Sequence, residues 1–141
     1  MNRIVVGTVV LLLGVLVALV PQYVFPVCPG LIETVAGKHV PMKCFWMARA
    51  ELGVGFIIGL SGLVMLLSKN MGVRLGLSMG ALFAGIVVIA LPVCLIGVCP
   101  SPQMACHAGT LPALIILGAL TILTTLFNAV YLHRQTGKQH A

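Results

Sequence analysis

Acidic residues are almost missing from this chain of 141 residues: it has no Asp, and its two carboxylates are Glu33 and Glu51. Charged residues of both signs make up 7% of the sequence, whereas soluble domains carry roughly 25%. This composition excludes a soluble domain. The eight Lys and Arg residues give a formal net charge of +6, but they are spread along the chain and form no dense stripe for a phosphate backbone. We therefore expect no nucleic-acid binding.

Enzyme motifs are missing as well. The chain has no Gly-rich phosphate loop, no G-x-S-x-G and no H-E-x-x-H. Its five cysteines contain no Cys-x-x-Cys spacing, the arrangement that prepares a thiol pair for exchange. With two carboxylates and no such motif, the sequence favours a protein that is not an enzyme and needs no cofactor.

Long apolar runs fill the sequence, of which 60% is hydrophobic. Four runs are long enough to cross a bilayer as helices: Ile4–Val20, Phe45–Leu67, Leu75–Val98 and Leu111–Leu132. These runs predict an all-α integral membrane protein with four transmembrane helices, in one domain over residues 1–141. The lipid bilayer is its expected environment.

The distribution of cations predicts which way the helices face. Four spans put both termini on one side, and cytoplasmic loops carry an excess of Lys and Arg. The side of the termini holds five of them, namely Arg3, Lys69, Arg74, Arg134 and Lys138. The opposite side holds three, namely Lys38, Lys43 and Arg49. We expect cytoplasmic termini and extracytoplasmic cysteine-rich loops, in the cytoplasmic membrane of a prokaryote.

An internal duplication relates the two halves of the chain. A shift of 71 positions aligns GVLVALVP with GIVVIALP and Val27-Cys28-Pro29 with Val98-Cys99-Pro100. Met42-Lys43-Cys44 and Met104-Ala105-Cys106 then precede the next span in each half. The sequence thus predicts two similar helical hairpins, pseudo-repeats 1–70 and 71–141, about an axis along the membrane normal. The duplication also argues that the first span is retained and is not a cleaved signal peptide.

Four cysteines at the extracytoplasmic side are candidates for disulfides. The pairing consistent with the repeat joins Cys28 to Cys44 and Cys99 to Cys106, but four cysteines allow three connectivities, and pairing between the hairpins stays open. Cys94 is left over as a free thiol. We expect it to be buried and inert, with a resolving thiol as the alternative.

Soft-metal binding is another chemical possibility. Thioether, thiolate and imidazole ligands of the kind that Cu(I) selects gather near the same side. The set consists of Met42, Cys44, Met47, Met104, Cys106 and His107. Disulfide formation would remove both thiolates, and Met is also a common filler of apolar interiors.

Two charges open the second span. Arg49 and Glu51 stand two positions apart and therefore point to different faces of a helix, while Trp46 is typical of an interfacial anchor. The three residues form a candidate polar lock with the loops or with a partner. Small residues follow in the second and third spans, including Gly55, Gly59, Gly76 and Gly80, and allow close helix packing in the bundle or against a partner helix.

The chain resembles a family of small four-helix prokaryotic membrane proteins classed as a domain of unknown function. The resemblance covers nearly the whole chain. It rests on a CPG motif, on an M-x-C before a helix that opens with W-x-A-R-A-E, and on a second cysteine cluster. In this sequence these are Cys28-Pro29-Gly30, Met42-Lys43-Cys44, Trp46, Ala48-Arg49-Ala50-Glu51, Cys99 and Cys106-His107. The resemblance implies fold and topology, and it suggests a role beside ABC-type permeases.

Three functions follow as hypotheses. The first is a non-catalytic accessory subunit of a membrane complex, such as a transporter, whose disulfide-pinned cap contacts another membrane protein or a second copy of the chain. The second is a membrane thiol–disulfide redox protein that works with a quinone. The third is Cu(I) handling by the Cys, Met and His cluster.

Overall fold

Four long helices form the molecule, and their apolar length confirms the predicted fold class. The computed structural model describes residues 2–27, 31–33, 35–41, 43–98, 101–103 and 106–139. Helices that could cross a membrane cover Asn2–Val24, Lys43–Leu67, Met71–Leu95 and Cys106–Lys138. The chain is thus a multi-pass membrane protein surrounded by lipid.

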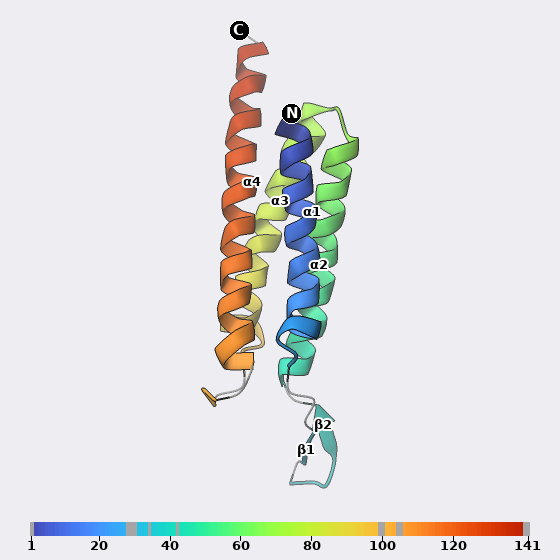
Figure 1. Ribbon diagram of the computed structural model, residues 1–141, viewed down its shortest axis with the longest axis vertical. Coiled ribbons are helices and arrows are strands. Elements are labelled where there is room, and N and C mark those ends of the chain that lie inside the picture. Colours follow the sequence, from blue (N-terminus) through green and yellow to red (C-terminus); the bar gives the residue numbers. More distant parts are fainter. Residues whose placement is uncertain are drawn as a thin grey trace.

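The helices run up and down as a bundle (Figure 1). Their bounds are α1 Asn2–Leu19, α2 Lys43–Leu67, α3 Met71–Ala90 and α4 Leu111–Gln139. Both termini lie at one end, which we call the terminal end; the opposite end, where α2 begins, is the distal end. Helix α1 packs most extensively with α2 and α3 with α4, so the two hairpins are the packing units.

Three segments of π-helix adjoin the long helices at the distal end. They are η1 Val20–Val24 after α1, η2 Leu91–Leu95 after α3, and η3 Cys106–Thr110 before α4. In η1 and η2 a proline stands near the start, Pro21 and Pro92. Proline cannot donate to the helix, and its ring clashes with the carbonyl four residues earlier, so the turn widens.

The same widened turn recurs at positions 71 residues apart. The Phe25 amide donates to the Val20 carbonyl oxygen at 2.9 Å, and the Ile96 amide donates to that of Leu91 at 3.0 Å. Equal local geometry at equivalent positions supports the predicted duplication, which itself stays a prediction.

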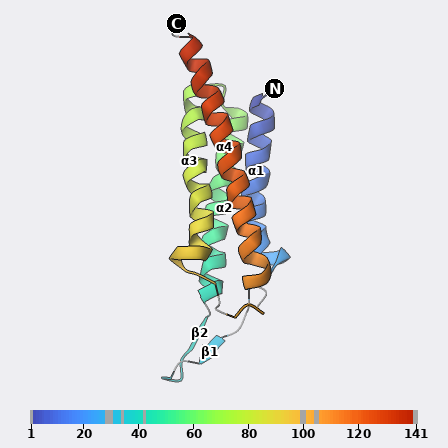
Figure 2. The same cartoon turned by 90° about the vertical axis from the view of Figure 1, so that its left-hand side faces the viewer.

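A small β-hairpin follows α1 and was not predicted. Strands β1 Leu31–Glu33 and β2 His39–Pro41 pair antiparallel, with Ile32 opposite Val40. Gly37 lies in the connection with φ 71°, a conformation that suits glycine. The hairpin extends beyond the distal end of the bundle in both views (Figure 2).

Close backbone contact holds the first hairpin together. A Cβ added at Gly14 would lie 2.3 Å from the Gly59 nitrogen, and one at Gly62 would lie 2.4 Å from the Leu11 nitrogen. In the second hairpin Gly85 and Gly118 also face each other, but less closely: a Cβ added at Gly118 would lie 3.0 Å from the Gly85 carbonyl oxygen. Gly76 and Gly80 instead face open space. The small residues of α1, α2 and α4 therefore pack helices within each hairpin. In α3, Gly85 does so as well, whereas Gly76 and Gly80 lie on a face that no other helix covers.

The buried core runs through all four helices. Its fully buried apolar residues are Val10, Val17, Met47, Ile58, Ala81, Val88 and Leu114. Val27 and Val98, which precede Cys28 and Cys99 in the sequence, pack against this cluster. The core therefore continues to the last described residues before both Cys-Pro motifs.

Candidate functional site

Cys44 and Cys106 meet at the distal end of the bundle. Cys44 lies in the first turn of α2 and Cys106 opens η3, so each hairpin contributes one sulfur. Their Sγ atoms are 3.3 Å apart, and both side chains are fully buried. This separation is a contact between two sulfurs and exceeds the roughly 2.05 Å of a covalent disulfide. The two M-x-C cysteines of the pseudo-repeats are thus brought together across the bundle.

The two predicted disulfides within the hairpins involve Cys28 and Cys99, which lie outside the described residues. Met42 and Met104, proposed as soft-metal ligands, lie outside them as well. Of the other proposed ligands, Met47 is fully buried and His107 is half-buried. Within the described part of the chain, no group of three or more His, Cys, Asp or Glu side chains could hold a metal ion.

Hydrogen bonds join the elements around the sulfur pair. Thr110 Oγ1, fully buried at the end of η3, donates to the Phe25 carbonyl oxygen at 3.0 Å. Gln22 in η1 donates from Nε2 to the Ala48 carbonyl oxygen at 3.1 Å. The first bond ties the two hairpins together and the second ties η1 to α2. The two elements that carry the sulfurs are therefore hydrogen-bonded to the same region: α2 to η1, and η3 to Phe25 directly after η1.

Glu51 lies on the same face of α2 as Cys44 and Met47. The spacings of three and seven residues return to one side of a helix, and all three side chains are buried. Neither carboxyl oxygen of Glu51 has a hydrogen-bond partner among the described residues. Ionisable groups buried in a membrane span are costly and are typical of functional positions.

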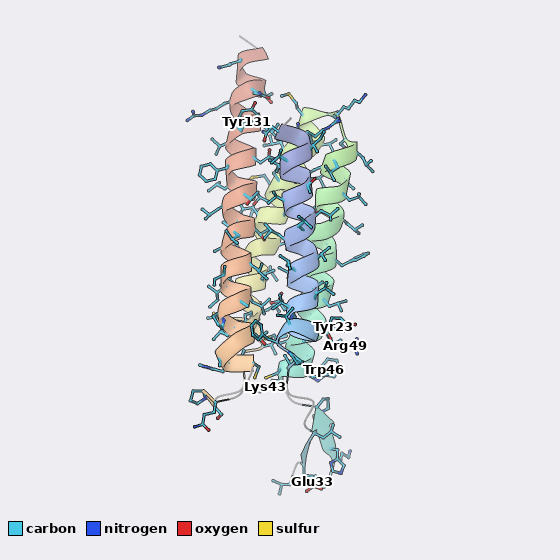
Figure 3. The ribbon with its side chains drawn as sticks, viewed as in Figure 1. Tyr23, Glu33, Lys43, Trp46, Arg49 and Tyr131 are labelled. Carbon is cyan, nitrogen blue, oxygen red and sulfur yellow. The ribbon has the colours of Figure 1, made fainter. Side chains whose placement is uncertain are left out.

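Trp46 and Arg49 occupy the other side of α2 (Figure 3). Trp46 is 57% exposed and packs edge-on to Phe45, with ring centroids 5.9 Å apart. The Arg49 guanidinium carbon lies 5.2 Å from the centre of the Phe45 ring. Arg49 is exposed while Glu51 is fully buried. The three residues of the predicted polar lock are therefore not together: Trp46 and Arg49 lie at the surface, each against Phe45, whereas the Glu51 carboxyl group is buried.

Cys94 is exposed in η2 and has a free thiol. The expectation that it is buried is wrong. The widened turn at Pro92 rotates the side chains that follow it relative to an uninterrupted α-helix, so spacing along a regular helix misplaces this residue.

A second buried polar group lies at the terminal end, and the sequence analysis missed it. Asn128 in α4 donates from Nδ2 to Ser78 Oγ at 2.6 Å, and Ser78 donates to the Arg74 carbonyl oxygen at 2.9 Å. Asn128, Ser78 and Arg74 are all buried. The signal available was the recurrence of Ser, Thr and Asn in otherwise apolar spans, where polar residues hold helices together.

Comparison with known families identifies the chain. A family model described as "Domain of unknown function (DUF4418)" matches residues 10–131. The chain belongs to this family. The match covers α2 and α3 in full, parts of α1 and α4, and both cysteines of the sulfur pair. Searches of curated proteins and of solved structures give no match.

Proposed function

We propose that this protein is a membrane thiol–disulfide redox protein whose working groups are Cys44 and Cys106. The observation that carries the proposal is the 3.3 Å distance between two buried sulfurs, one from each hairpin. A movement of little more than 1 Å brings them to the length of an S–S bond. The missing Cys-x-x-Cys spacing is replaced here by tertiary proximity.

The reaction transfers two electrons and two protons. Oxidation forms the bond between Cys44 Sγ and Cys106 Sγ, and each thiol loses its proton. With a disulfide substrate, the S–S bond of that substrate breaks and its two sulfurs take up the electrons and protons as thiols. With a quinone, the two ring oxygens take them up and a quinol results. Burial of the pair in a membrane protein favours the lipid-soluble quinone.

Glu51 supports this proposal as the carboxyl group nearest in sequence to Cys44 within the bundle. It lies roughly 10 Å along the helix from Cys44 at 1.5 Å per residue, too far for a direct proton transfer. Its place on the same buried face of α2 makes it the carboxyl group to replace when testing whether buried polar groups affect the sulfur pair.

The test is thiol trapping in intact membranes. Protein is alkylated with and without reductant, and its modified cysteines are mapped by mass spectrometry after addition of a quinone or of an oxidised thiol protein. We expect a Cys44–Cys106 disulfide to form with one of them and to disappear on reduction. Cys94→Ser is the matched control and should behave like the wild type, whereas Cys44→Ser and Cys106→Ser should form no such bond.

Other results would contradict the redox proposal. A cross-link with the same occupancy under every redox condition would make the sulfurs a structural staple. Stoichiometric Cu(I) binding by the reduced protein, with both thiols protected from alkylation, would instead support the metal hypothesis.

A second candidate, an accessory subunit of a membrane complex, is favoured by the projecting β-hairpin. Its exposed apolar side chains include Leu31, Val35 and Val40, at 60%, 112% and 43% exposure. Exposed apolar groups beyond the bundle are typical of a contact with another protein. Under this proposal the hairpin lies outside a prokaryotic cytoplasmic membrane and meets a transporter, with ABC-type permeases as the class to test first.

Affinity capture from detergent-solubilised native membranes tests the accessory role. The wild type should retain a defined membrane partner that Val35→Asp loses, while Thr136→Ala at the other end retains it. Capture of no partner by the wild type, together with a monodisperse isolated protein, would exclude this role.

A further inference from the structure

Arg74 is a buried positive charge at the terminal end. It lies in the first turn of α3, is 9% exposed, and its Nε atom has no hydrogen-bond partner among the described residues. A guanidinium group stays charged in proteins. A buried charge is costly unless it is paired or fully hydrogen-bonded, so Arg74 requires an acceptor.

No side-chain carboxylate of the chain is placed to supply that acceptor. Glu33 lies in the β-hairpin beyond the distal end, 3.7 Å from His39 Nε2. Glu51 precedes the end of α2 by 16 positions, which puts it roughly 20 Å from the level of Arg74 at 1.5 Å per residue. These are the only two acidic side chains in the sequence. Neither acidic side chain of the sequence can therefore serve as the counter-charge of Arg74.

A second arginine and a helix end add positive charge near Arg74. Arg3 in α1 is near enough to repel the Arg74 charge, whereas Tyr131 in α4 acts in the opposite direction and favours it. The amino end of α3 adds the positive end of its helix dipole. Two arginines and a helix amino terminus thus gather where three helices meet.

A cavity of about 590 Å³ lies between α1 and α4 and is lined in part by Tyr131, an electrostatic neighbour of Arg74; neither Arg3 nor Arg74 lines the cavity itself. Its polar lining comes from Asn2, Thr124, Asn128 and Tyr131, and its apolar lining from Val6 and Phe127. Helix α4 crosses the bundle obliquely, so its terminal end lies away from α1 (Figure 2). Phe127 is 74% exposed, which means that the cavity opens toward the surrounding lipid.

Asn128 links this cavity to Arg74. Its side chain is 3% exposed and reaches the backbone of Arg74 through Ser78. Its Oδ1 atom is buried and has no donor among the described residues. Arg74 Nε is thus a donor, and Asn128 Oδ1 an acceptor, without a partner among the described residues. A ligand with both a negative charge and a hydroxyl group has the complementary groups.

We propose that the terminal end binds one anionic phospholipid. Its phosphate lies against Arg74 and Arg3, its headgroup hydroxyl donates to Asn128, and an acyl chain lies along Val6 and Phe127. Basic pockets between membrane helices are suited to such headgroups, and Arg matches the geometry of a phosphate. The bilayer is the source of the phosphate because the cavity opens between two membrane-spanning helices.

Lipid titration of the purified protein tests this site. Full-length protein in a neutral detergent is titrated with phosphatidylglycerol, with phosphatidylcholine of the same chains, and with inorganic phosphate. Retained lipid is counted by native mass spectrometry, and Tm is measured in parallel. We expect one retained phosphatidylglycerol, a higher Tm with this lipid alone, and an affinity at least tenfold above that for phosphatidylcholine.

Variants separate the site from a general charge effect. Arg74→Gln should lose about tenfold or more in affinity for phosphatidylglycerol, and Arg3→Gln should lose less, whereas the exposed Arg134→Gln should bind like the wild type. Arg74→Lys keeps the charge and guards against misfolding of the glutamine variant; it should retain part of the affinity.

Equal retention of the two lipids would overturn the proposal, and so would wild-type affinity in Arg74→Gln together with Arg3→Gln. A Tm shift produced fully by inorganic phosphate would overturn the lipid as source in favour of a free anion.

Discussion

The two ends of the bundle carry polar groups of opposite kinds. At the distal end, Cys44 and Cys106 touch while Glu51 is buried with no partner among the described residues. At the terminal end, Asn128 and Ser78 form a hydrogen-bonded connection between α4 and α3 next to Arg74. The distal end therefore holds a buried sulfur pair and a carboxyl group, whereas the terminal end uses a hydrogen bond between polar side chains to join α3 and α4.

Helices α1 and α2 pack closely along their length, between the two ends of the bundle. Disruption of this interface should have the largest effect on stability. Gly14→Ala puts a Cβ atom 2.3 Å from the Gly59 nitrogen, a clash with backbone that side-chain motion cannot relieve. We expect a loss of about 3 kcal/mol in the free energy of unfolding. Thermal unfolding in detergent measures it. Gly76→Ala, where a Cβ meets open space, is the control; equal losses in the two variants would show that the contact is unimportant.

Glu51 provides the next test, with the opposite sign. Glu51→Met replaces a buried carboxyl group that lacks a described partner by an apolar side chain of similar length. We expect a gain of about 2 kcal/mol in stability, since the desolvation penalty of the polar group is removed. Denaturation in mixed micelles measures the gain, and thiol trapping should show a changed oxidation rate of Cys44 and Cys106. A destabilised variant would mean that Glu51 has an essential partner.

The corresponding change at the terminal end should destabilise the protein. Asn128→Leu removes the 2.6 Å hydrogen bond to Ser78 Oγ. We expect a loss of about 1 kcal/mol, typical of one buried hydrogen bond. Thr124→Val, one helical turn away, is compared in the same unfolding experiment and should lose less. If Asn128→Leu and Glu51→Met change stability in the same direction, the contrast between the two ends is wrong.

Arg49 should give the smallest effect. Arg49→Gln removes an exposed cation from the Phe45 ring, which lies 5.2 Å away. We expect a loss of about 0.5 kcal/mol, as for exposed cation–π pairs. A loss above about 2 kcal/mol would indicate that Arg49 also holds the distal loops.

The sequence was most informative where a pattern is one-dimensional. Length and apolarity predict four spans, and the observed helices confirm them because each span must satisfy its own backbone hydrogen bonds in lipid. Pro21 and Pro92 occupy equivalent positions in the repeat, and each stands near the start of a π-helical turn. The exposure of Cys94 was predicted wrongly because such a turn changes which face of the helix a residue occupies.

Pairing between distant segments could not be derived in this way. Spacing places Cys44 and Cys106 at the starts of two helices, but only the packing of the hairpins puts their sulfurs 3.3 Å apart. Periodicity likewise separates Arg49 from Glu51, yet it does not say which of them faces the core. The sequence by itself determined the membrane class, the four spans and the scarcity of acidic side chains. Tertiary structure decided which sulfurs meet and where a cavity lies between α1 and α4, because these depend on how helices far apart in the chain pack side by side.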